Sequence, residues 1–240
     1  MTPRQAKILE YVILEYMETA QAVGSVSMSR KYRVDASPAT IRNEMANLID
    51  LGFLSKEHFS SGRIPTTVGF RYYLENFLRE EDLNYLDEMA IKEALHESRF
   101  QREKILKTAV EILSKHLEYT AIALASGSLY YSGISDILNY PEFEDLATLK
   151  NIISVIENAD ILDSIFEKGN KYEGGVKILI GEETGFNSFS SCAIAYKGFR
   201  LHRGEQGYLA VIGPFRMNYN KVLPFLNYTA DILEEVTSGW

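Results

Sequence analysis

The order of the first predicted elements constrains the fold of this chain more than any other feature of its sequence. The run Thr2–Gln5 has the form of a capping box with proline at the first helical position. Ile8, Val12 and Tyr16 then follow at helical spacing. These signals predict a first helix that runs to about Thr19.

Glycine and proline mark the limits of two further helices. Gly24 breaks the first helical pattern, and a short second helix is predicted from about Ser25 to Tyr32. The run Asp35–Pro38 supplies a turn and a helix cap, and the third helix is predicted from Pro38 to about Leu51, where Gly52 stops it. The chain therefore begins with three helices in close succession.

A small hairpin is predicted directly after the third helix. Phe53 and Leu54 begin a short strand, Phe59–Arg63 resembles a hairpin tip, and Ile64 and Pro65 begin the return strand. Three helices followed by a hairpin form a winged helix-turn-helix, which binds DNA by placing one helix in the major groove. We therefore expect residues 1–79 to form a DNA-binding domain.

The third helix has two faces of different character. At about 100° per residue, Ile41, Met45 and Leu48 lie on one side and face the domain core, whereas Ala39 and Asn43 lie opposite. Asparagine pairs with adenine and arginine with guanine or phosphate, while small residues let the backbone approach the bases. We predict DNA contacts on this helix from Ser37, Ala39, Thr40, Arg42, Asn43 and Asn47, and on the hairpin and beyond it from Lys56, Ser61, Gly62, Arg63 and Arg71.

The charge distribution is compatible with this prediction. The net charge of the whole chain is −8, which is unusual for a nucleic-acid-binding protein. Residues 1–79, however, carry ten basic and eight acidic side chains, whereas residues 80–240 carry fifteen and twenty-five. The acidic excess therefore belongs to the second part of the chain.

The rest of the chain predicts an α+β arrangement. A charged helical pattern from about Leu86 to Leu117 indicates a connecting helix over residues 80–118, with a second domain over residues 119–240. Strands are expected at 120–125, 176–180, 191–196 and 208–212, a helical stretch at about 141–166, and a last helix through Val222 and Val236 that contains Pro224.

Enzymatic and metal chemistry find little support in the sequence. Cys192 is the only cysteine, and His96 and His116 are too far apart around a helix to share a metal ion. The adjacent pair Glu182 and Glu183 points to opposite faces of a strand and has no partner for acid–base catalysis. We expect no enzymatic activity, no metal and no cofactor. Without a signal peptide or a long apolar run, a cytoplasmic protein that does not enter a membrane is predicted.

Several runs closely resemble the HrcA family of heat-inducible transcription repressors. They are Ser37–Leu48, Leu51–Leu54, Ser60–Thr66 and Gly69–Tyr73, and the likeness continues more loosely through 130–139, 180–183 and 211–217. The resemblance implies a GAF-like C-terminal domain and repression through an inverted-repeat operator upstream of chaperone genes. It also implies a GroEL-type chaperonin as a possible partner, and DNA-contact roles for Thr40, Arg42, Asn43 and Arg63. One winged helix covers a single half-site, and specific affinity generally needs two half-sites bound together, so a homodimer with its interface in the acidic second part of the chain is predicted.

Two departures separate this sequence from typical members of the family. Where those members have Arg-Thr after the Gly-Ser of helix two, this chain has Val26 and Ser27. Typical members also carry a long insertion, including a dimerisation domain, between the segment 119–124 and Tyr130, where this chain has only 125–129.

The alternative function is a ligand-responsive regulator, because GAF-like domains often enclose a small-molecule cavity. In this chain Tyr196, Phe199 and Tyr208 would line that cavity.

Overall fold

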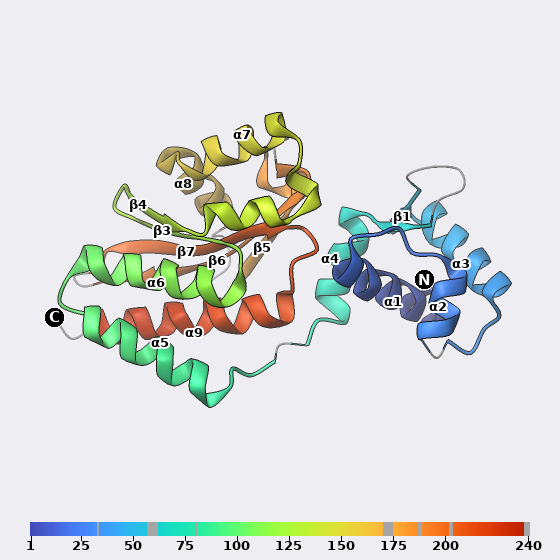
Figure 1. Ribbon diagram of the computed structural model, residues 1–240, viewed down its shortest axis with the longest axis horizontal. Helices are drawn as coiled ribbons and strands as arrows, with labels where there is room; N and C mark the ends of the chain where they lie inside the picture. Colours follow the sequence, from blue (N-terminus) through green and yellow to red (C-terminus); the bar gives the residue numbers. More distant parts are fainter. Residues whose placement is uncertain are drawn as a thin grey trace. The chain divides into compact units, whose positions relative to one another are not determined.

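The structure is a computed structural model that describes residues 1–32, 34–56, 62–79, 81–169, 175–186, 189–201 and 204–237. The chain divides into two compact units, Met1–Arg79 and Glu80–Trp240. The first unit is mostly helical, and the second contains a five-stranded sheet covered by helices (Figure 1). The predicted α+β class is therefore confirmed.

The N-terminal unit begins with the predicted succession of helices. Thr2 and Gln5 form the capping box, in which each backbone N–H donates to the other side chain, at 2.8 and 3.2 Å. The predicted bounds of the first three helices hold to within one residue. The elements are α1 (Pro3–Thr19), α2 (Ser25–Lys31), α3 (Pro38–Asp50), the antiparallel strands β1 (Leu54–Ser55) and β2 (Ile64–Pro65), and α4 (Thr67–Asn76).

The C-terminal unit is built on a sheet in which every neighbouring pair of strands is antiparallel. The strand order is β4-β3-β7-β6-β5. Four strands match the predicted runs, and β4 was not predicted. The strands are β3 (Thr120–Ala125), β4 (Ser128–Ser132), β5 (Lys177–Ile180), β6 (Cys192–Arg200) and β7 (Gln206–Pro214).

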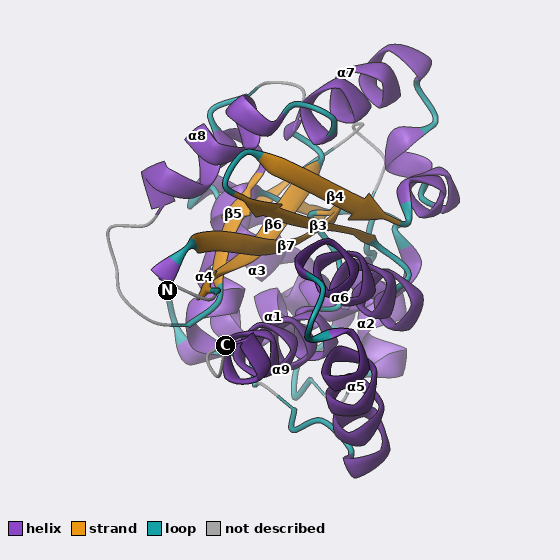
Figure 2. Ribbon diagram, turned by 90° about the vertical axis from the view of Figure 1, so that its left-hand side faces the viewer, coloured by secondary structure: helices purple, strands orange, loops and turns teal. Residues whose placement is uncertain are grey.

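Helices cover both faces of this sheet (Figure 2). On one face lie α6 (Arg102–Leu117) and α9 (Tyr219–Thr237), which contains Pro224. The helix α5 (Tyr85–Ser98) packs against these two helices. On the other face α7 (Leu146–Ile156) and α8 (Ala159–Gly169) enclose an apolar core with alternate residues of the strands. The described residues also include the short 3-10 helices η1 (Ile134–Asn139), η2 (Pro141–Phe143) and η3 (Gly181–Thr184).

The prediction of a single connecting helix over residues 80–118 is wrong. Two helices occupy this region, and both pack against α9 as well as against each other. The chain reverses direction between Ser98 and Arg102. The buried faces of α5 and α6 can therefore both pack against α9. A hydrogen bond of 2.9 Å between the hydroxyls of Ser98 and Thr108 joins the two helices beside this reversal.

A tight hairpin joins β3 to β4. Ala125 pairs with Ser128, and the two intervening residues, Ser126 and Gly127, have φ angles of 45° and 73°. Positive φ at both central positions characterises the type I′ turn, whose twist suits a two-residue hairpin. A continuous strand pair therefore occupies the place where the family resemblance puts a long insertion.

Candidate nucleic-acid interface

The third helix begins with a local network at its N-terminus. The Ser37 hydroxyl accepts a hydrogen bond of 3.1 Å from the Thr40 backbone N–H and lies 2.9 Å from the Thr40 hydroxyl. Serine at the N-cap followed by Pro38 at the first helical position is a strong helix-start signal. The structure therefore gives Ser37 and Thr40 a helix-capping role.

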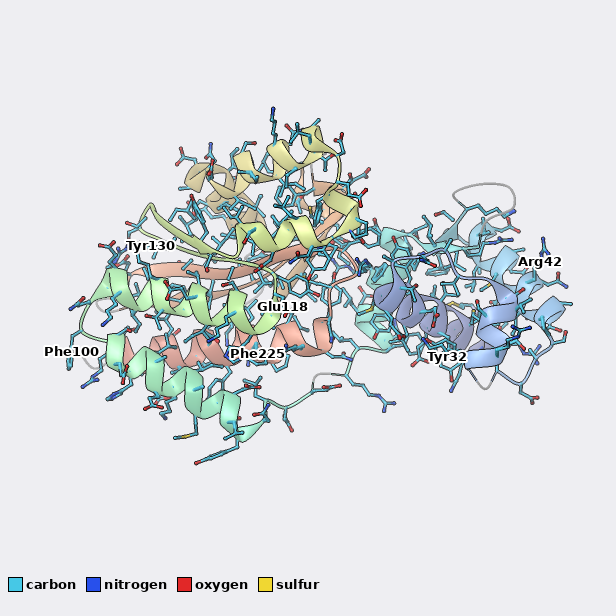
Figure 3. All side chains as sticks on the ribbon, in the orientation of Figure 1. Tyr32, Arg42, Phe100, Glu118, Tyr130 and Phe225 are labelled. Atoms are coloured by element: carbon cyan, nitrogen blue, oxygen red, sulfur yellow. The ribbon has the colours of Figure 1, made fainter. Side chains whose placement is uncertain are left out.

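The two faces of α3 are those that the sequence predicted. Ile41, Met45 and Leu48 are buried in the unit's core. The opposite face is exposed, and Figure 3 shows Arg42 pointing away from the rest of the unit. The exposed residues of this face are Ala39, Arg42, Asn43, Ala46 and Asn47.

The polar side chains of α3 differ in whether they have partners. Glu44 accepts hydrogen bonds from Gln5 of α1, at 3.0 Å, and from Asn47, at 3.2 Å, so the amide of Asn47 is engaged within its own helix. Among the described residues, the side chains of Arg42 and Asn43 have no hydrogen-bond or ion-pair partner. These two side chains are therefore available to an external ligand, whereas the Gln5–Glu44 bond fixes α3 against α1.

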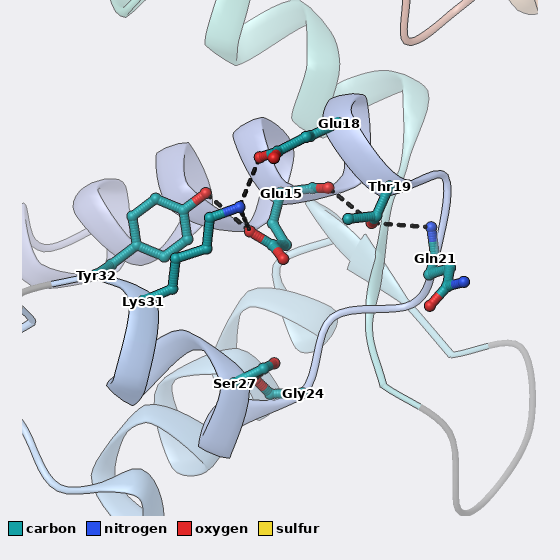
Figure 4. A network of polar contacts seen from close by, with 8 residues as sticks. All are labelled: Glu15, Glu18, Thr19, Gln21, Gly24, Ser27, Lys31 and Tyr32. Atoms are coloured by element: carbon teal, nitrogen blue, oxygen red, sulfur yellow. Dashed lines mark hydrogen bonds and ion pairs between the residues drawn. The ribbon is translucent and has the colours of Figure 1, made fainter.

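A second network fixes α2 against α1 (Figure 4). Lys31 lies 2.7 Å from the carboxylate of Glu15 and 2.6 Å from that of Glu18, and the Tyr32 hydroxyl donates to Glu15 at 3.0 Å. The hydrogen bond from Lys31 lowers the pKa of Glu15, while burial and the bond to Glu15 raise the pKa of Tyr32 to about 12. The Tyr32 ring also stacks on Tyr11, with ring centres 4.5 Å apart. The sequence reasoning missed this network because it joins residues of different elements.

Arg63 does not occupy the exposed hairpin tip where it was predicted. Its backbone pairs with Val23, with N–H to carbonyl distances of 2.8 and 2.9 Å, and only 9% of the residue is exposed. The segment before β2 therefore runs beside the connection between α1 and α2. A short backbone pairing between distant segments leaves little signal in the sequence, so the prediction had no means of finding Val23.

Gly62 explains how this close approach is possible. A Cβ atom added at Gly62 would lie 2.5 Å from the backbone carbonyl group of Ala22. Any side chain at this position would force the two segments apart, because protein interiors leave no room for such an overlap. The structure thus gives Gly62, a predicted DNA-contact residue, a packing role.

The remaining predicted residues lie apart from α3 or outside the described residues. Lys56 is exposed just after β1, and its side chain has no partner among the described residues. Arg71 is half-buried on α4, which packs against α1 and β2. Ser61 lies outside the described residues, as does most of the predicted hairpin tip.

The C-terminal unit does not assemble the aromatic residues suggested for a ligand cavity. Tyr196 and Tyr208 pack in the core beneath α8, with Phe166 4.9 and 5.1 Å from their rings. Phe199 lies on the other face of the sheet, because it is three residues from Tyr196 along β6 and side chains alternate along a strand. The three residues therefore do not line one cavity.

Metal sites, catalytic carboxylates and membrane-spanning helices are the other features that bear on function. In the part of the chain that the structure describes, no group of three or more His, Cys, Asp or Glu side chains is arranged to hold a metal ion. Glu183 accepts a hydrogen bond of 2.8 Å from the Ile180 backbone N–H, which gives it a local structural role. No described helix is both long and apolar enough to span a membrane.

Comparison with known proteins places the chain in a class. The family described as HrcA protein C terminal domain matches residues 66–223. The heat-inducible transcription repressor HrcA of Bacillus pumilus is 25% identical over 341 aligned positions, covering all of this chain and 98% of the relative. Its counterpart in Symbiobacterium thermophilum is 26% identical over 334 positions, covering 97% and 98%. The relatives define the class as transcription repressors. This chain belongs to the HrcA family of heat-inducible transcription repressors.

The comparisons also bear on the fold and the length. A crystal structure of a protein described as hypothetical superposes with a TM-score of 0.78 at 17% identity, covering all of this chain and 99% of the other. The alignment with the Bacillus relative spans 341 positions, whereas this chain has 240 residues. About a hundred aligned positions therefore have no counterpart here.

Proposed function

We propose that the N-terminal unit is a winged helix-turn-helix that binds double-stranded DNA with α3 in the major groove. The observation that carries this proposal is that the side chains of Arg42 and Asn43 are exposed and unpartnered among the described residues. Both lie opposite the buried stripe of α3. Their helix is held from behind by the hydrogen bond between Gln5 and Glu44. Unpartnered polar groups on a helix that is held in place suit contact with the base edges and phosphates of DNA.

The neighbouring residues suit the same role. Ala39 and Ala46 are small, so the helix backbone can approach the base edges on this face. Asn43 has the amide geometry for a bidentate contact with adenine. Lys56, exposed after β1, would contact the phosphate backbone beside the groove.

The operator is proposed to be an inverted repeat that controls chaperone genes, with two copies of the chain bound to its halves. One winged helix covers a single half-site, and joining two makes the second contact effectively intramolecular. The C-terminal unit, proposed to be a shortened GAF-like domain, would supply the dimer interface. Its helix α5 exposes Tyr85, Leu86 and Met89 on one side, an apolar surface suited to such contact. The chaperonin partner stays a prediction from the family resemblance.

The decisive experiment replaces Asn43 and compares two DNA duplexes. Footprinting on the DNA upstream of the protein's own gene first locates the operator. Asn43→Ala is then expected to weaken binding to this operator by about 1–3 kcal/mol and to leave binding to random-sequence DNA unchanged. The control is Asn76→Ala, because Asn76 is an exposed asparagine on α4. Equal losses on both duplexes would show that Asn43 does not read bases.

The dimer is tested by sedimentation at micromolar concentration with and without the operator. The expected result is a dimer that binds the full inverted repeat more tightly than one half-site. A monomer under both conditions that binds both DNAs equally would contradict it.

A further inference from the structure

A pocket of about 200 Å³ lies in the N-terminal unit beside the exposed face of α3. Three parts of the chain line it: residues 23–26 at the start of α2, Arg42 and Met45 from α3, and Gly62 and Arg63 before β2. A water molecule occupies about 30 Å³ in the liquid. The pocket therefore has room for several waters or for one group of phosphate size.

The charged side chains that line this pocket are both arginines, and no carboxylate is among the lining residues. Arg42 is exposed and has no partner among the described residues, and Arg63 approaches from the more buried side. Two guanidinium groups on one pocket repel each other, and this repulsion is stronger where water is partly excluded. An anion between them reverses the sign of the interaction, and the guanidinium fork matches the oxygens of a phosphate.

The walls of the pocket are fixed by contacts that do not involve the arginine side chains. The backbone pairing of Val23 with Arg63 joins two walls, and Gly62 lets the segments approach. Met45 is 2% exposed and forms part of the core as well as of the pocket. The pocket is thus formed before any ligand binds, which reduces the cost of binding.

We infer that this pocket binds one backbone phosphate of the DNA duplex between Arg42 and Arg63, separately from the bases read by Asn43. The inference rests on the proposed function, because the adjacent face of α3 is the proposed DNA surface. It assigns Arg42 to phosphate rather than to guanine. Phosphate contacts carry no sequence information, so this pocket contributes equally to binding of every duplex.

The test is a charge series at Val26 in the full-length protein. Val26 lines the pocket and is 52% exposed, so Val26→Arg, Val26→Gln and Val26→Glu do not disturb the core. Val68 on α4 is 57% exposed and does not line the pocket, and the same three replacements there form the matched control. Binding of each variant to a random-sequence duplex and to the operator is measured as a function of NaCl concentration.

Val26→Arg is expected to steepen the plot of log affinity against log salt, and Val26→Glu to flatten it, by about 0.9 each. That change alters the ratio of Kd values at 200 and 50 mM salt by about 3.5-fold. Val26→Gln should behave as the wild type, the Val68 series should change the slope far less, and both duplexes should respond alike.

If the Val26 and Val68 series change the slope of log affinity against log salt equally, the inference is overturned. A charge anywhere on the unit would then alter the salt dependence of DNA binding. A response confined to the operator would also overturn it, since it would indicate base contact. Inorganic phosphate at constant ionic strength tests the other source of the same chemistry. Stabilisation by phosphate together with a flat Val26 series would assign the pocket to a free anion and overturn the DNA assignment. A wild-type protein that binds neither duplex would refute the proposed function itself, and the inference with it.

Discussion

Replacing Gly62 by alanine tests whether this residue acts by packing or at the DNA. The new Cβ would meet the carbonyl carbon and oxygen of Ala22 at 2.5 Å and the carbonyl carbon of Val23 at 2.7 Å. These are backbone atoms, so a flexible side chain cannot relieve the overlap. The segment before β2 must move away, and the two hydrogen bonds between Val23 and Arg63 are then lost.

The size of the effect follows from these contacts. Two backbone hydrogen bonds contribute about 0.5–1.5 kcal/mol each, and alanine recovers about 0.4–1 kcal/mol by restricting the unfolded chain. Central values of these ranges give a net loss of stability for the N-terminal unit of about 1–2 kcal/mol. Because 1.4 kcal/mol corresponds to a factor of ten, amide hydrogen exchange at Val23 and Arg63 should accelerate about 5- to 30-fold.

The matched control is Gly24→Ala in the same segment. The nearest atom to a Cβ at Gly24 is the Ser27 hydroxyl oxygen at 3.6 Å, an ordinary contact, so exchange at Val23 should change little. Loss of DNA binding in Gly62→Ala with unchanged exchange at Val23 and Arg63 would refute the packing argument. Gly62 would then act by direct approach to the DNA.

Two further predictions concern ion pairs in the two units. In the C-terminal unit, Glu142 and Arg216 are joined by two hydrogen bonds, and their side chains are only 11% and 12% exposed. Because Glu142→Gln leaves the largely buried Arg216 charge without its carboxylate, it should lower the free energy of unfolding in chemical denaturation by about 2–3 kcal/mol. An unchanged midpoint would show that water already reaches this pair. In the N-terminal unit, the pKa of Glu15 is lower in the folded than in the unfolded state. The ionised Glu15 carboxylate therefore stabilises the fold above the ordinary pKa of 4.5, and this stabilisation is lost as the pH falls through the lowered pKa. Thermal unfolding should therefore show less acid sensitivity below about pH 4.5 in Lys31→Met than in the wild type, and equal acid sensitivity would contradict the pairing of Glu15 with Lys31.

The elements of the N-terminal unit were predictable because their signals are local. The capping box at Thr2, the cap at Ser37 and the spacing of Ile41, Met45 and Leu48 each depend on residues within a few positions of one another. The exposed face of α3 followed from the same periodicity. The family resemblance added the class of protein, which the comparisons confirm.

The prediction over residues 80–118 failed because helical periodicity does not reveal where a chain reverses. The apolar positions of α5 and α6 fit one long helix as well as two short ones. The choice depends on α9, which is distant in the sequence and packs against both. The strand β4 was missed for a related reason, since its side chains are half-buried or, at Tyr131, exposed, and give a weak apolar pattern.

The sequence by itself determined the helices of the first unit and which side of α3 faces outward, because these properties depend on residue type and short spacing. It also determined the class of the protein, through the likeness of whole runs such as 37–48 and 60–66 to the HrcA family. Only the tertiary structure decided the place of Arg63, the packing role of Gly62, and the pocket that joins Arg42 to Arg63. Each of these depends on the approach of Val23 to a segment about forty residues further along the chain. Such an approach depends on how the helices pack, and packing energy is shared among many residues rather than carried by one local pattern.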